Sequence, residues 1–211
     1  MQSLCETYWL PLYSYVRCRG YSTDDAQDLT QEFFARLLTK NSMATADPRC
    51  GKFRSFLLAT LKNFLCDEWD KSRALKRGGA HYLCPLEFED GERIYKLEPT
   101  NNVSPEHIYE RRWALTLLTK VMSTLEQEYS LSGKAELFAD LRPCLVGERT
   151  AQPYATMADA LDVTESAVKS MVHRLRSRYR TLLRKEISET VAAEDEVDEE
   201  LSYLFEILSR K

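Results

Sequence analysis

The sequence predicts an all-α fold made of two small helical domains. Glycine and proline occur only seven times each in 211 residues, well below their usual shares of about 7% and 5%. Few turn-forming residues favour long helices over many short strands. Apolar residues also recur at three- and four-residue spacing in several segments, which is the pattern of amphipathic helices. The 44% apolar and 29% charged residues are values of a globular chain and exclude disorder of the whole chain.

The first domain is expected at residues 1–77. Ser22 and Asp25 have the spacing of a capping box at a helix start, and the apolar stripe that follows predicts a helix ending near Lys40. The stripe consists of Ala26, Leu29, Phe33 and Leu37. A polar loop at 41–51 precedes a second long helix. Its expected core face consists of Phe53, Phe56, Leu57, Leu61, Phe64 and Leu65, and the cations expected outside that face are Lys52, Arg54, Lys62, Lys71 and Arg73.

Residues 78–104 are expected to form a linker. Gly78 and Gly79 end the helical pattern, and the chain from 81 to 102 shows no helical period. A small hairpin around Asp90-Gly91 is an alternative, but an extended linker is favoured. Ser104 followed by Pro105 is a typical helix start, so a second domain is expected at 105–185.

A helix-turn-helix is predicted between residues 154 and 184. A short helix, 154–161, is followed by a tight turn at 162–164, and Thr164 caps a second helix. We expect Met157, Ala158 and Leu161 to pack against Val163, Val168 and Val172. The start of the second helix is then free to enter a major groove. The alternative is a basic amphipathic helix on a solvated surface.

Charge is distributed unevenly along the chain, whose net charge is −4. Residues 166–185 hold seven Lys and Arg residues and no acid, whereas residues 186–211 hold nine acids against Arg210 and Lys211. A basic helix-length block followed by an acidic extension indicates a polyanionic partner and an internal mimic of it.

Enzymatic, metal-binding and membrane functions find no support in the sequence. The six cysteines are scattered singly, without a Cys-x-x-Cys pair, so reduced thiols are expected rather than a zinc or redox site. No phosphate-binding loop or nucleophile elbow is present, and no catalytic residue or cofactor is expected. The longest apolar run, 56–59, is far too short to span a membrane, and the N-terminus does not resemble a signal peptide. A cytoplasmic protein is expected.

The two halves together resemble a bacterial RNA polymerase sigma factor of the extracytoplasmic-function class of the sigma-70 family. Residues 24–34 look like the region 2 helix that binds the clamp helices of the polymerase β′ subunit. Residues 53–63 are similar to the following helix, which opens and reads the −10 element, and residues 154–176 match the region 4 helix-turn-helix that reads the −35 element. Asp162 stands where this turn usually has Gly, and Phe56 where the region 2 helix more often has Trp.

The resemblance implies three sets of site residues. The polymerase-binding residues would be Asp25, Asp28, Gln31 and Glu32. The −10 DNA-binding residues would be Arg54, Lys62, Asn63, Lys71, Arg73, Lys76 and Arg77. The −35 DNA-binding residues would be Thr164, Ser166, Lys169, His173, Arg174, Arg176 and Arg178. Within the last set, Lys169, His173 and Arg174 are expected to read bases and the other two arginines to grip phosphate. Phe56 is expected in the core, and for Trp69 a core position is favoured over stacking on a promoter base.

The function predicted from these features is that of a sigma factor, which directs core RNA polymerase to specific promoters and assists promoter opening. Its partners would be the β′ clamp helices and β flap of the polymerase, promoter DNA, and an anti-sigma factor or regulatory kinase. The alternative is a stand-alone helix-turn-helix regulator. The aromatic and basic helix at 53–77 and the polar face around Asp28 argue against it.

The acidic extension, 186–211, is expected to contain a short amphipathic helix after Asp195. Its apolar stripe would be Val197, Leu201, Leu204 and Leu208, at helical spacing. Two interpretations stand side by side. The extension either aids solubility while its stripe packs on the region 4-like domain, or it contacts the basic face at 174–184 and suppresses DNA binding.

Overall fold

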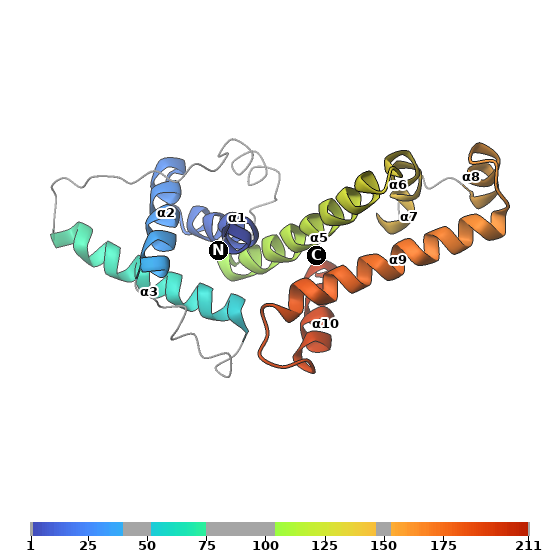
Figure 1. The fold of residues 1–211 in the computed structure, drawn as a ribbon. Helices are drawn as coiled ribbons and strands as arrows, with labels where there is room; N and C mark the ends of the chain where they lie inside the picture. Colours follow the sequence, from blue (N-terminus) through green and yellow to red (C-terminus); the bar gives the residue numbers. More distant parts are fainter. Residues whose placement is uncertain (1, 40–51, 75–103, 147–152, 211) are drawn as a thin grey trace. The chain divides into compact units, whose positions relative to one another are not determined.

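The computed structural model describes residues 2–39, 52–74, 104–146 and 153–210, and the described segments are helical with short turns and no strand (Figure 1). The all-α prediction is confirmed. The loop at 41–51, the hairpin considered at Asp90-Gly91, and Lys76 and Arg77 lie outside the described residues. Within the described ranges, no helix has the length and apolar character needed to cross a membrane.

The chain divides into two compact units. The N-terminal unit comprises residues 1–116 and 187–211, and the helix-turn-helix unit comprises residues 117–186. The boundaries between the units lie inside two continuous helices, α5 (Pro105–Leu131) and α9 (Glu165–Ser188). The expected boundary is the linker at 78–104. The division also differs from the expected one at the C-terminus, since the acidic extension belongs to the N-terminal unit.

Three helices begin the N-terminal unit: α1 (Gln2–Cys18), α2 (Thr23–Thr39) and α3 (Phe53–Ala74). Ser22 caps the start of α2, because the Asp25 N–H donates to Ser22 Oγ at 3.1 Å, and the Ser22 hydroxyl donates to Asp25 Oδ2 at 2.7 Å. Gly20, with φ of 92°, makes the turn between α1 and α2. The core of the three helices consists of Tyr8, Leu12, Val16, Ala26, Phe33, Leu37, Leu57 and Leu61.

The C-terminal helix α10 (Glu196–Ser209) completes the core of the N-terminal unit. The predicted helix is confirmed, but its packing on the region 4-like domain is not what the structure shows. Its buried face is also rotated from the predicted stripe, because Leu201 and Leu208 are only half-buried while Ile207 is fully buried. Glu200 lies on this apolar face with 1% of its surface exposed. A carboxylate buried in this way requires a cationic partner.

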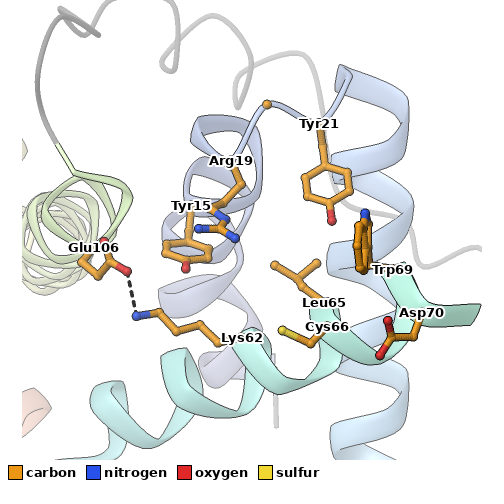
Figure 2. Close-up of a pocket in the computed structure, with 10 residues that line it drawn as sticks. Tyr15, Arg19, Tyr21, Lys62, Leu65, Cys66, Trp69, Asp70 and Glu106 are labelled. Atoms are coloured by element: carbon orange, nitrogen blue, oxygen red, sulfur yellow. Dashed lines mark ion pairs between the residues drawn. The ribbon is translucent and has the colours of Figure 1, made fainter. Parts of the chain in front are cut away.

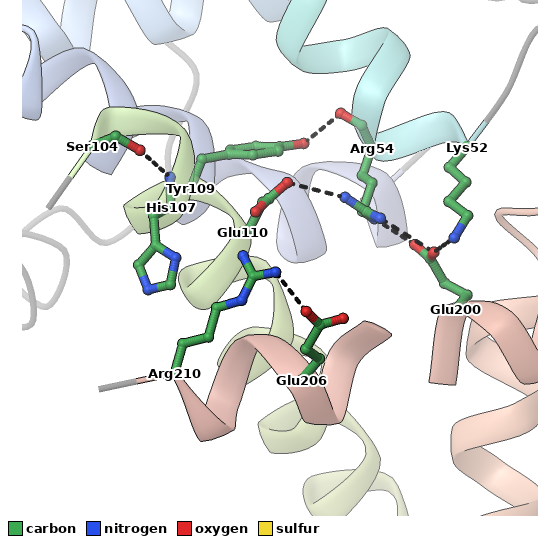
Figure 3. Close-up of polar contacts among 9 residues, drawn as sticks. All are labelled: Lys52, Arg54, Ser104, His107, Tyr109, Glu110, Glu200, Glu206 and Arg210. Atoms are coloured by element: carbon green, nitrogen blue, oxygen red, sulfur yellow. Dashed lines mark hydrogen bonds and ion pairs between the residues drawn. The ribbon is translucent and has the colours of Figure 1, made fainter. Parts of the chain in front are cut away.

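Arg54, at the start of α3, is that partner (Figure 3). Its Nε donates to Glu200 Oε1 at 2.5 Å and its Nη2 to Oε2 at 3.3 Å, and Lys52 Nζ reaches Oε2 at 2.7 Å. The guanidinium also lies over the rings of Tyr203 and Trp113, at 4.1 and 5.0 Å from their centroids. Burial disfavours the charged form of Arg54, but the hydrogen bonds and charge of Glu200 outweigh this effect and raise the pKa of Arg54.

The helix-turn-helix unit contains the rest of α5 with α6 (Ala135–Leu141), α7 (Pro143–Val146), α8 (Tyr154–Ala160) and most of α9. The Ala167 N–H donates to Thr164 Oγ1 at 3.2 Å, so Thr164 caps α9 as predicted. Asp162 adopts the left-handed conformation with φ of 51°, which short polar side chains tolerate. The packing residues predicted between α8 and α9 are buried or half-buried, with Met157, Ala158, Val168 and Val172 among the most buried.

Substituting Glu200 with Ala should lower the free energy of unfolding by about 3–5 kcal/mol, because it leaves the buried guanidinium of Arg54 without its main acceptor. Urea unfolding of the full chain measures this. Glu206→Ala is the matched control, since Glu206 lies on the same helix in an exposed ion pair with Arg210 and should cost no more than about 1 kcal/mol. Equal losses for the two variants would contradict the importance of the buried pair.

Candidate functional site

An acidic stripe runs along the exposed face of α2. Asp25, Asp28 and Glu32 are all exposed at helical spacing, and Gln31 is half-buried beside them. Glu32 is ion-paired with Arg36, whose guanidinium also reaches Glu68 of α3 at 2.8 Å. The stripe is thus presented by a helix that is itself fixed to α3. The structure brings the four predicted residues onto one surface.

A groove of about 830 Å³ lies between the end of α1, the turn to α2, the face of α3 and the start of α5 (Figure 2). Leu65 forms part of its floor, and Tyr21 and Trp69 stand on one side. Trp69 is 54% exposed, so its predicted core position is wrong. The reason is that Leu65 is the last buried side chain described on α3, and the helix extends beyond the packed core. The remaining lining residues are Tyr15, Arg19, Gly20, Lys62, Cys66, Asp70 and Glu106.

Lys62 closes the groove by an ion pair with Glu106 at the start of α5, at 2.7 Å. The hydrogen bond from Lys62 lowers the pKa of Glu106, and the same bond raises the pKa of Lys62. Asn63, the next residue along α3, is exposed. A cation and an amide therefore lie next to each other at this surface.

The other predicted −10 residues do not all share this surface. Arg54 is 6% exposed and engaged by Glu200, so its expected position outside the core face is corrected. Its hydrocarbon stem and guanidinium face α5 and α10 because their acids and aromatic rings surround it. Lys71 and Arg73 belong to α3, but the structure describes only their helical backbone.

The exposed face of α9 carries the predicted base-reading residues. Ser166, Lys169 and His173 are exposed at spacings of three and four residues, and Arg174 is exposed next to them. Lys169 makes an ion pair with Glu165 at 2.7 Å, in which both side chains are at least half exposed. A pair of this kind is easily exchanged for another partner. The structure brings these residues together at the N-terminal half of the second helix of the motif.

Arg176 and Arg178 are engaged within the helix-turn-helix unit. Arg176 Nη2 donates to the Cys144 carbonyl at 2.9 Å, which joins α9 to α7. Arg178 makes a two-pronged ion pair with Glu128 of α5, at 2.8 and 2.5 Å, and this hydrogen bonding lowers the pKa of Glu128. Sequence reasoning missed both partners because they lie far away along the chain.

Comparison with known proteins identifies the N-terminal helices. Residues 4–74 match the family model of Sigma-70 region 2. The match covers about a third of the chain, and this segment is similar to sigma-70 region 2. It contains the acidic stripe of α2 and the groove face of α3, and it supports a sigma factor's role in transcription initiation, with RNA polymerase as a partner. Sigma factors are not a class of enzymes. No curated protein and no solved structure matches the chain.

Sequence reasoning missed Glu200, the buried acid that binds Arg54 at the start of α3. A signal for it exists, because Val197, Glu200 and Leu204 have the spacing of one helical face. An acid between two apolar residues at that spacing indicates a buried carboxylate with a cationic partner. Sequence alone does not say which of the many cations that partner is.

The pKa of Glu106 should respond to Lys62. Because the folded-state pKa of Glu106 is lowered, its ion pair stabilises the fold above the ordinary carboxylate range and is lost as pH falls through the lowered value. Lys62→Met should raise this pKa toward the ordinary range, because the hydrogen bond from Lys62 is the largest cause of the shift. Carbon-detected NMR titration of the Glu106 carboxyl group in both proteins measures the shift, and identical titration curves would exclude the pair in solution.

Proposed function

We propose that this chain is a sigma factor of the extracytoplasmic-function class, which directs core RNA polymerase to specific promoters and assists their opening. The observation that carries the proposal is the combination of a sigma region 2 domain at residues 4–74 with a second unit that contains a helix-turn-helix and an exposed basic face on α9. Such a protein acts in the cytoplasm, under the control of an anti-sigma factor or a regulatory kinase.

The acidic stripe of α2 supplies the polymerase-binding surface in this proposal. Asp25, Asp28 and Glu32 accept hydrogen bonds and carry negative charge, so they complement Arg and Lys residues of the β′ clamp helices. Gln31 adds an amide at the edge of the stripe. The helix-turn-helix unit docks on the β flap, which holds the −35 duplex against it.

The groove side of α3 supplies the −10 surface. Exposed Trp69 offers a ring on which an unstacked base can lie, and Asn63 offers a donor and an acceptor to a base edge. Lys62 reaches phosphate by leaving Glu106. Lys71, Arg73, Lys76 and Arg77 follow in the sequence and add phosphate contacts.

The start of α9 supplies the −35 surface. Lys169, His173 and Arg174 read base edges in the major groove, and Thr164 and Ser166 approach from the N-terminal end of the helix. Arg178 binds phosphate by exchanging the Glu128 carboxylate for a backbone phosphate. Arg176 fixes the position of α9 through Cys144 and contacts phosphate from there.

Run-off transcription tests the proposal directly. Purified core polymerase with this protein, on a library of genomic fragments, should produce transcripts that start at a common pair of promoter elements. Polymerase without the protein is the control. A protein that binds DNA by itself but neither joins core polymerase nor supports transcription would instead be a stand-alone regulator.

Reversing the charge of Asp28 and Glu32 together, by Asp28→Lys and Glu32→Lys, should abolish binding to core polymerase because the stripe would then repel basic clamp residues. Circular dichroism should show unchanged helix content, since both side chains are exposed. Asp198→Lys with Glu199→Lys is the matched control, with the same change of charge on exposed residues of α10. Unchanged affinity of the α2 variant would refute this docking surface.

Trp69→Ala should weaken binding of a single-stranded −10 oligonucleotide by the holoenzyme by about 1–3 kcal/mol, the value of one base–aromatic stack. Phe205→Ala is the control because Phe205 is equally exposed, at 56%, on α10. Fluorescence anisotropy with labelled DNA measures both. An equal effect of the two substitutions would exclude a specific stacking role for Trp69.

Lys169→Ala and Arg174→Ala should change the preferred −35 sequence, with a loss of about 1–3 kcal/mol at the base that each reads. Arg178→Ala should instead weaken binding to all sequences alike and reduce the salt dependence. Binding to randomised −35 duplexes at several salt concentrations separates these effects. Sequence profiles identical to that of the wild type for all three variants would contradict the division of roles.

A further inference from the structure

Two cations converge on one carboxylate at the start of α3. Arg54 and Lys52 both bind Glu200, and Lys52 is the residue immediately before the first turn of α3 (Figure 3). The Phe53 N–H also donates to the Thr190 carbonyl at 3.3 Å, so the connection to α10 contacts the same end of the helix. The beginning of the −10 helix is therefore covered by the acidic extension.

Burial of Glu200 needs a reason beyond packing. An apolar residue at position 200 would extend the face formed by Val197, Leu204 and Ile207, and such replacements of buried ion pairs are often neutral or stabilising. Three other acids of α10, Asp198, Glu199 and Glu206, are exposed, and the half-buried Glu196 accepts a hydrogen bond from the Ala192 N–H. Glu200 is thus the acid of this helix that is directed at cations of the region 2 domain.

A carboxylate and a phosphodiester present the same chemistry to an Arg–Lys pair. Both are anionic oxygen acceptors that bind the planar guanidinium with paired hydrogen bonds and the ammonium as a point charge. The same α3 helix carries Asn63 and Trp69 further along. A DNA strand lying along α3 would bring a phosphate to its first residues.

We propose that the Glu200 carboxylate occupies a phosphate-binding site formed by Lys52 and Arg54, and that promoter DNA enters this site only when α10 is displaced. This inference rests on the proposed function, because it assigns the site to the −10 strand. The acidic extension is then autoinhibitory, but it acts on region 2 rather than on the basic helix of region 4.

In the free protein, α10 covers the buried guanidinium of Arg54. Its three buried apolar anchors and the buried ion pair hold it in place, so only a small fraction of molecules exposes Arg54, whereas Lys52 is half-buried with α10 in place. The apparent dissociation constant for DNA is the intrinsic value divided by that fraction.

The test compares Glu200→Gln with Glu206→Gln in the full-length protein. Each substitution removes one negative charge from α10, but only the first weakens the contact with Lys52 and Arg54. At low salt, the Glu200 variant should bind a forked −10 oligonucleotide up to about tenfold more tightly than wild type, and the Glu206 variant within about twofold. Adding Lys52→Gln to the Glu200 variant should remove the gain. Equal affinities of the two single variants, or no binding by either, would overturn the proposal.

Hydrogen exchange on the wild-type protein provides a second measurement, which decides the question even when the Glu200 variant does not fold. In the holoenzyme, addition of the forked oligonucleotide should reduce the protection of the amides of α10, because DNA and the helix exclude each other. Unchanged or increased protection would overturn the proposal. Loss of the proposed function looks different: the holoenzyme would then bind no promoter with any variant.

Discussion

The buried ion pair between Arg54 and Glu200 is the interaction on which the N-terminal unit depends. It joins the start of α3 to α10, which is separated from it by most of the sequence. Trp113 and Tyr203 cover the guanidinium, and the Tyr109 hydroxyl donates to the Arg54 carbonyl at 2.9 Å. Helix α3 and the acidic extension therefore share one core, in which both partners of the ion pair are buried.

Intramolecular acids engage many of the cations that the proposed function assigns to DNA. Lys62 binds Glu106, Lys169 binds Glu165, and Arg178 binds Glu128. These pairs are exposed and individually weak, so a phosphate backbone can displace the carboxylates. Arg54 differs because its pair is buried, and exchange there requires movement of a whole helix. Under the proposed function, the exposed cations exchange their carboxylate partners for phosphate directly, whereas Arg54 does so only after α10 moves.

Helices α5 and α9 are each shared by the two units. Each helix begins in one unit and ends in the other. α9 carries the exposed residues Lys169, His173 and Arg174 near its start. Its last residues lead to the connection in which the Thr190 carbonyl accepts a hydrogen bond from the Phe53 N–H at the start of α3.

The sequence by itself determined the local structure. The helices α2, α8, α9 and α10 follow from apolar periodicity and from capping residues such as Ser22 and Thr164, because these signals act over three or four residues. The left-handed Asp162 in the turn and the exposed faces of α2 and α9 could be predicted for the same reason. Capping and helical periodicity depend on residues that are close in sequence, so the sequence alone is enough to predict them.

Only the tertiary structure decided which distant groups meet. Arg54 is buried and Lys62 lines a groove. Nothing local in the sequence distinguishes them, because both are cations next to residues of the apolar face of α3. Their difference comes from α10 and α5, whose acids select one cation for the interior and the other for the surface. The exposure of Trp69 likewise depends on where the neighbouring helices end. Long-range pairing of charges depends on the whole core, which is why it could not be read from spacing alone.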